Sequence, residues 1–273
     1  MALDPILILE LVGLGLMSGF LAGLLGIGGG MVMVPFLTLI MSTRGAGADL
    51  AVKMAIATSM ATIVFSSISS VRAHHKRGAV RWDLVRGLTP GILLGSLISS
   101  VGLFSLLKGH YLAIFFGLFV GFSATQMFLD RKPKGSRQMP GGAGQWIAGS
   151  LIGLLSGLVG AGGGFINVPF MAWCNVAMHN AVATSAALGF PIAAANAAGY
   201  AYGGLSASGE LPPDSFGFIW LPALGIIASC SVLMAPVGAR LAHRLPVKQL
   251  KRIFALVLYG LAAYMLWKGL SSL

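Results

Sequence analysis

The stretch GLLGIGGGMVMVPFL, residues 23–37, places three consecutive glycines and a proline inside an apolar segment. Glycine and proline are the residues that the interior of a helix tolerates least. The stretch therefore predicts a helix that is interrupted at this place.

The same pattern returns as GLVGAGGGFINVPFM, residues 157–171, with nine of fifteen positions identical. An Ala-Thr-Ser triplet follows each copy, at residues 57–59 and 183–185. The sequence thus predicts two homologous halves. They span residues 1–130 and 144–273, and a basic linker, residues 131–143, joins them.

The composition is that of a membrane protein. Of 273 residues, 56% are apolar and 9% are charged, whereas about a quarter of an average soluble domain is charged. Apolar runs of roughly 17 to 25 residues, long enough to span a bilayer, recur from end to end. We therefore expect an all-α polytopic membrane protein, whose first segment lacks the features of a cleaved signal peptide.

The loop charges predict how the two halves are related. The formal net charge is +11, but the cations lie in short loops, which favours a topological role over nucleic-acid binding. Segments 72–86, 131–137 and 240–252 are basic and are expected in the cytoplasm, whereas segment 203–217, with Glu210 and Asp214, is expected outside. Equivalent loops then lie on opposite sides, as in an inverted-topology repeat.

That topology requires each glycine segment to enter the membrane and return, either as a helix, a break and a short helix or as a re-entrant hairpin. Pro35 suits the first turn of a helix, which predicts a short half-helix over residues 35–41. In the competing topology, each glycine segment is a single kinked helix, and each half crosses the membrane four times.

The glycine clusters are the main candidates for a substrate site. Consecutive glycine N–H groups in front of a half-helix can converge on an anion without a charged side chain. Tight helix packing is the alternative reason for the glycines. The predicted backbone ligands are Gly28, Gly29 and Gly30 in the first half and Gly162, Gly163 and Gly164 in the second.

Side chains near the clusters are weaker candidates. Asn167 could donate to a bound oxyanion or complete a hydrogen bond between helices. The hydroxyl pairs Thr58-Ser59 and Thr184-Ser185 could bind substrate or bond back to their own helices. A further set could gate the path or attract an anion, or could simply be topological charge, namely Arg72, His74, Lys53 and His179.

Several kinds of chemistry lack a motif. Neither glycine cluster completes a nucleotide-binding motif, no metal or cofactor site is expected, and Cys174 and Cys230 have no redox spacing. Only Glu10 among the acids lies within an apolar segment, which leaves little for a sodium site or a proton relay. An enzyme is not expected, and an importer that uses the cysteines as carriers remains an alternative.

The chain resembles the TauE/SafE family of membrane permeases, the sulfite exporter family. The resemblance rests on G-x-GGG-x-x-x-VPF at 26–36 and 160–170, on the Ala-Thr-Ser triplets and on the loop RAHHKRG at 72–78. It implies export of a small sulfur-containing anion, such as sulfite or sulfoacetate, across the bacterial inner membrane. Transport of another small anion, and pairing of the chain as a homodimer, are left open.

Overall fold

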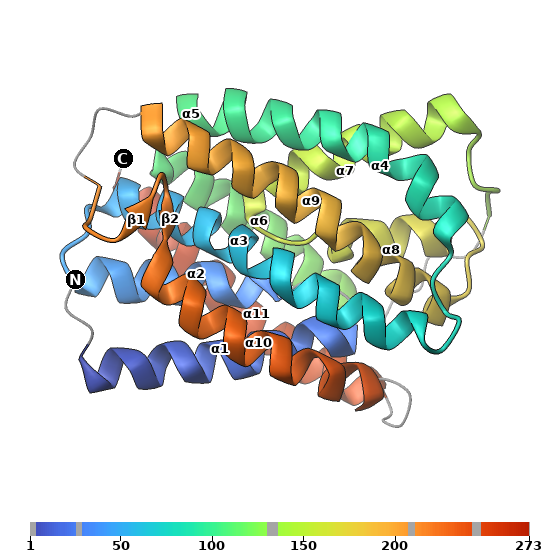
Figure 1. The fold of residues 1–273 in the computed structure, drawn as a ribbon, viewed down its shortest axis with the longest axis horizontal. Helices are drawn as coiled ribbons and strands as arrows, with labels where there is room; N and C mark the ends of the chain where they lie inside the picture. The colour runs from blue at the N-terminus through green and yellow to red at the C-terminus, as the bar shows by residue number, and fades with distance from the viewer. Residues whose placement is uncertain (1–3, 26–28, 130–135, 207–210, 242–246, 273) are drawn as a thin grey trace.

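The computed structural model describes residues 4–25, 29–129, 136–206, 211–241 and 247–272, which are almost entirely helical (Figure 1). The first half contains α1 (Pro5–Leu25), α2 (Gly30–Thr43), α3 (Ala48–His75), α4 (Trp82–Leu97), the π-helix η1 (Ile98–Leu103), α5 (Phe104–Leu106) and α6 (Gly109–Phe128). The second half contains α7 (Gly142–Val159), α8 (Gly164–Trp173), α9 (Met178–Ser206), the hairpin of β1 (Ser215–Phe216) and β2 (Ile219–Trp220), α10 (Leu221–Leu241) and α11 (Val247–Leu270).

Eight helical segments in the described residues are long and apolar enough to cross a membrane. One of them, Trp82–Leu106, joins α4, η1 and α5 into a single span. The other spans are α1, α3, α6, α7, α9, α10 and α11, while α2 is shorter. The prediction of an all-α polytopic membrane protein is therefore confirmed.

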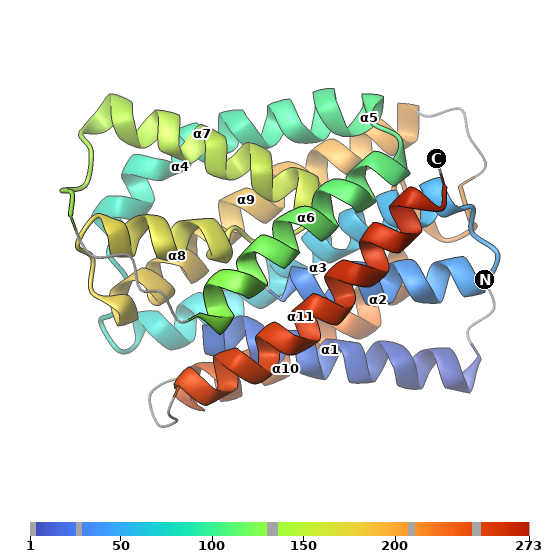
Figure 2. The ribbon, with the colours of Figure 1, turned by 180° about the vertical axis from the view of Figure 1, so that it is seen from behind.

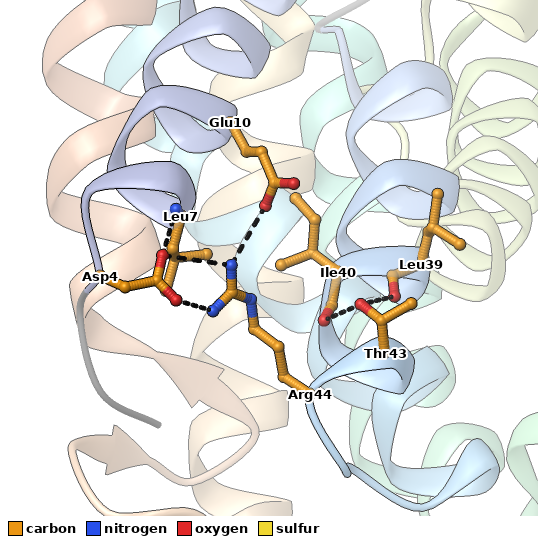
Figure 3. A network of polar contacts seen from close by, with 7 residues as sticks. All are labelled: Asp4, Leu7, Glu10, Leu39, Ile40, Thr43 and Arg44. Carbon is orange, nitrogen blue, oxygen red and sulfur yellow. Dashed lines mark hydrogen bonds and ion pairs between the residues drawn. The ribbon is translucent and has the colours of Figure 1, made fainter.

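At one end of the molecule α1 begins and α2 finishes. Arg44, just after α2, forms an ion pair with Asp4 at 2.6 Å and reaches Glu10 at 3.5 Å (Figure 3). The hydrogen bond from Arg44 lowers the pKa of the Asp4 carboxyl, which also accepts the Leu7 N–H at 2.6 Å as a helix cap. Helix α1 thus runs from this end into the molecule, and α2 runs back to the same end.

We call this end the terminal end, because α11 also finishes here, with Gly269 packed against His110 at the start of α6. The opposite end collects the end of α3 and the starts of α4 and α9. There the Trp82 indole N–H donates to His75 at 3.2 Å, and Asn180 donates to the carbonyl of Ala79 at 2.8 Å. The two ends together fix the direction of each helix.

The second end is rich in cations, and we call it the basic end. Arg77 donates to the carbonyl of Ala239 at 2.9 Å, which brings the end of α10 here as well. The linker reaches the same place, because the Ser136 N–H donates to the carbonyl of Trp173 at the end of α8. The described cations near this end include Arg72, Lys76, Arg77, Arg81, Arg86, Arg137 and Arg240.

The helices of the two halves interleave. Helix α1 packs on α10, and its counterpart α7 packs on α4, the counterpart of α10 (Figure 1). Helices α3 and α9, and helices α6 and α11, pack on their own counterparts (Figure 2). The set of pairings therefore stays the same when the two halves are exchanged.

Glycine ridges allow the first of these pairings to be close. A methyl group at Gly19 or Gly23 of α1 would overlap with the backbone of Ser231 or Ala235 in α10. The counterpart pair shows the same feature, since Gly153 of α7 lies against the backbone of Ile92 in α4. Small residues at four-residue spacing let helix backbones approach in this way.

The expected start of the short helix was wrong. Helix α2 begins at Gly30 rather than at Pro35, and α8 begins at Gly164 with Pro169 inside it. Residues Met31 to Val34 are fully buried in the core, where unpaired backbone groups are costly and helical bonds satisfy them. The break in each half is therefore narrower than the sequence suggested.

Candidate functional site

Each break turns on a glycine in the left-handed region. Gly29, with φ of 72°, precedes α2, and Gly163, with φ of 75°, precedes α8. A third such glycine, Gly160, ends α7 with φ of 70°. Only glycine adopts this region without a steric cost, which explains these positions in the doubled motif. Gly28 lies outside the described residues.

The two breaks meet inside the molecule. Gly30, the first residue of α2, packs against the carbonyl of Gly160 in the other half so closely that a methyl group would overlap with it. The hydroxyl of Ser59 on α3 donates to the same carbonyl at 2.9 Å. The structure thus brings Gly30, Ser59 and the second break together, and the two halves are joined at this point.

The first turn of each half-helix keeps free donors. The carbonyl of Gly163 accepts the N–H groups of Ile166 and Asn167, and that of Gly29 accepts those of Val32 and Met33. The first two N–H groups of each helix, starting at Gly164 and at Gly30, have no acceptor within their helix. They carry the positive end of the helix dipole at the breaks.

A small cavity lies beside the second break. Its volume is about 10 Å³, room for about one water molecule. It is lined by residues of α1, α3 and α9 and of the break itself: Ala22, Ile63, Ser66, Ser67, Ser70, Gly162, Ser185, Ala186 and Gly189. Ser70 is buried and its hydroxyl has no hydrogen-bond partner. We call this space the central cavity.

The cavity is part of a polar stripe along α3. Ser59, Thr62, Ser66, Ser70 and His74 follow one another at spacings of three or four residues, so they share one helix face. All five are at most 2% exposed. The stripe leads from the meeting point of the breaks to the basic end. Of these residues, the sequence analysis named only Ser59 and His74.

A second polar cluster lies on the other side of the break. Asn167 is fully buried, and neither its amide nitrogen nor its oxygen has a partner. Its amide lies beside Gly163, and the unpartnered hydroxyl of Ser156 lies near the same glycine. Along α9, Asn196 and Tyr200 are fully buried and the Tyr200 hydroxyl donates to the carbonyl of Gly157. This cluster leads toward the terminal end.

The threonines of the two triplets hold neighbouring elements. Thr58 accepts the N–H of Trp220, directly before α10, at 3.0 Å. Thr184 accepts the N–H of Arg81, directly before α4, also at 3.0 Å. These bonds join equivalent elements in the two halves. One of the expected roles was a bond from each threonine back to its own helix. In these two bonds the threonine hydroxyls instead accept N–H groups from other elements.

Other predicted residues are spread over the molecule. Lys53 lies near the terminal end, 3.9 Å from Asp49, and His179 is exposed near the basic end. Arg72 lies on a different face of α3 from the central cavity, whereas His74 is buried on the polar stripe. Cys174 follows α8 and Cys230 packs against Gly15, so neither lines the cavity. The described residues contain no metal-binding cluster.

Aromatic side chains close the molecule toward the terminal end. The ring centroid of Phe104 lies 4.2 Å from that of Tyr200 and 5.7 Å from that of Phe218 in the β-hairpin. Trp220, the last hairpin residue, is fully buried. The second polar cluster is therefore covered by large side chains on its way to this end.

Comparison with known proteins identifies the family of this chain. The family model described as "Sulfite exporter TauE/SafE" matches residues 11–265. A probable membrane transporter protein of Haemophilus influenzae is 36% identical over 93% of this chain and 96% of its own length. The probable membrane transporter protein YunE of Bacillus subtilis is 26% identical over 96% of this chain and 98% of its own.

No solved structure significantly matches the chain. The similar proteins carry transporter names and none carries the name of an enzyme. The match of the family model extends over nearly the whole described fold, including both glycine breaks. The chain is a membrane transporter that belongs to the TauE/SafE family.

Proposed function

We propose that this transporter exports a small sulfur-containing anion, sulfite or an organosulfonate such as sulfoacetate, through the central cavity. The observation that carries the proposal is the hydroxyl lining of this cavity, in which Ser70 has an unpartnered hydroxyl. Hydroxyl and N–H groups donate to the oxygens of an oxyanion. No described residue that lines the cavity is a carboxylate, which argues against a cation as substrate.

The half-helices support an anion on independent grounds. Both α2 and α8 begin at the breaks, so two positive dipole ends lie near the cavity. The N–H groups of Gly164 and Gly30, which have no acceptor within their own helices, and the buried amide of Asn167, which has no partner, are further donors. Gly29 and Gly163 shape the breaks, and Ser185 lines the cavity.

The pairing of helices supports two inverted repeats that move against each other. Equivalent helices start at opposite ends, and the pairing scheme is unchanged when the halves are exchanged. The cavity holds about one water molecule, so an oxyanion needs the helices to separate. The polar stripe along α3 leads toward the basic end, and the second polar cluster leads toward the terminal end. A rocking motion of the halves would open these two paths in turn.

The charge distribution favours export. By the positive-inside rule the basic end faces the cytoplasm. An anion that leaves an inside-negative cell gains about 2.3 kcal/mol per charge at 100 mV, so no coupling ion is required. The described carboxylates all lie in loops or within the first two turns of a helix. Uniport across a bacterial inner membrane is the mechanism that fits these features.

Flux measurements test the proposal. The purified protein is reconstituted in liposomes, and the fluxes of sulfite, sulfate, thiosulfate and sulfoacetate are measured at clamped membrane potential. We expect flux of sulfite or of a sulfonate that follows the potential. If none of the four anions shows such flux, the proposal is wrong.

The Ser70→Ala variant tests the location of the site. A hydrogen bond to a charged group contributes about 1.5 to 3 kcal/mol, so we expect the KM for the transported anion to rise about tenfold or more. Ser105→Ala is the matched control, because Ser105 is exposed and bonds to its own helix. Equal KM values in both variants would mean that the anion does not bind in the central cavity.

A further inference from the structure

A separate groove lies between the last turns of α3 and α10. Its volume is about 600 Å³, and it is open to the outside. Arg72 and Lys76 line it from α3, and Arg240 lines it from α10. Ser66 and Ser70 of the central cavity point from a different face of α3. We call this space the α3–α10 groove, and it is not part of the proposed transport site.

The groove concentrates positive charge. Arg72, Lys76, Arg77 and Arg240 line it, and all four are exposed. Among the described residues, no carboxylate lies within ion-pair distance of any of them, since the ion pairs found there involve Arg44, Lys53 and Arg81. Four uncompensated cations in one groove repel one another. A bound anion would relieve this repulsion.

The other part of the groove is apolar. Phe65 and Ile68 of α3 and Val232 and Pro236 of α10 line it. Phe65 is eleven residues before Lys76, which corresponds to roughly 16 Å along the helix toward the bilayer centre. Phe65 is 48% exposed, as a side chain in contact with lipid would be. Ser69 donates to the carbonyl of Val232 at 2.9 Å, so its hydroxyl is already satisfied.

We propose that the α3–α10 groove binds an anionic phospholipid. The phosphate lies among the four cations at the membrane surface, and an acyl chain lies along Phe65, Ile68, Val232 and Pro236. Basic pockets between helices at the cytoplasmic surface favour such headgroups. A small soluble anion would use the cations but would leave the apolar wall uncovered. The lipid would bridge α3 and α10, and so contact the back of the helix that carries the polar stripe.

Thermal unfolding of the full-length protein in a neutral detergent tests this proposal. Phosphatidylglycerol is added at increasing concentration, and phosphatidylcholine with the same acyl chains and inorganic phosphate are added in parallel. Because a ligand of the folded state raises its stability, we expect only phosphatidylglycerol to raise the unfolding temperature. Equal effects of the two lipids, or an equal effect of inorganic phosphate, would overturn the proposal.

Variants locate the binding site. In Arg72→Gln/Arg240→Gln we expect the apparent Kd for phosphatidylglycerol to rise about 25-fold, about fivefold for each cation. Arg86→Gln/Arg137→Gln removes the same charge at the same end but outside the groove, and its Kd should be unchanged. Ile68→Trp fills the apolar wall and should weaken binding with all charges present. Equal losses in the two double variants would mean general surface attraction and would contradict the proposal.

Discussion

Gly30 shows a steric reason for a glycine at its position in the doubled motif. The residue packs against the carbonyl of Gly160, and a methyl group there would overlap with it. We therefore expect Gly30→Ala to lower the free energy of unfolding by about 1 to 3 kcal/mol, the usual cost of overpacking. Thermal unfolding in detergent, followed by circular dichroism, measures the effect.

The matched control is Gly225→Ala in α10, where nothing lies within 4 Å of the added methyl group. Alanine is also the better helix former, so this variant should unfold at the wild-type temperature or above. If Gly30→Ala unfolded together with Gly225→Ala, the close contact between the two breaks would be absent.

At the same scale, the sequence draws attention to the glycines of the two breaks but not to the serines of the central cavity. Three glycines in an apolar segment are unusual, and their repetition makes them conspicuous. Ser66 and Ser70 are ordinary residues for a membrane helix, and only the burial of their helix face makes them part of a cavity. Their spacing, continued by His74, is the signal that could have indicated a polar stripe.

At the scale of elements, the arrangement of helix, break and short helix was predictable, but the helix start was not. Glycine and proline propensities favour a break up to Pro35, and these are local preferences. The buried position of Met31 to Val34 makes helical hydrogen bonds obligatory and overrides them. The roles of Thr58 and Thr184 were equally hidden, because their partners lie more than 100 residues away in sequence.

These threonines lead to a prediction about elements. In Thr184→Val the N–H of Arg81 loses its acceptor, and in Thr58→Val the N–H of Trp220 does. An unsatisfied buried donor costs about 1 to 3 kcal/mol, so we expect Thr58→Val to lose stability by such an amount. Thr184→Val should lose less, because its bond is only partly buried. Thr43→Val is the control, since that hydroxyl is exposed and bonds to its own helix. Stability losses no greater than that of Thr43→Val would show that the two bonds do not hold α4 and α10.

At the scale of the whole molecule, charge and symmetry point to the same arrangement. The first half finishes with α6 and leads into the linker at the basic end, whereas the second half finishes with α11 at the terminal end. Equivalent positions thus lie at opposite ends of the molecule. An inverted repeat in a membrane requires this relation, and the inverted repeat stays a prediction.

Cysteine labelling tests this relation in cells. Ser136→Cys follows the first half and Ser272→Cys follows the second, each in a background with Cys174 and Cys230 replaced by alanine. Because cations mark the cytoplasmic side, a membrane-impermeant maleimide should label Ser272→Cys in intact cells. It should label Ser136→Cys only after the membrane is permeabilised. Labelling of both from the same side would require an even number of crossings in the second half, as in the count of four crossings per half, and would exclude the inverted repeat.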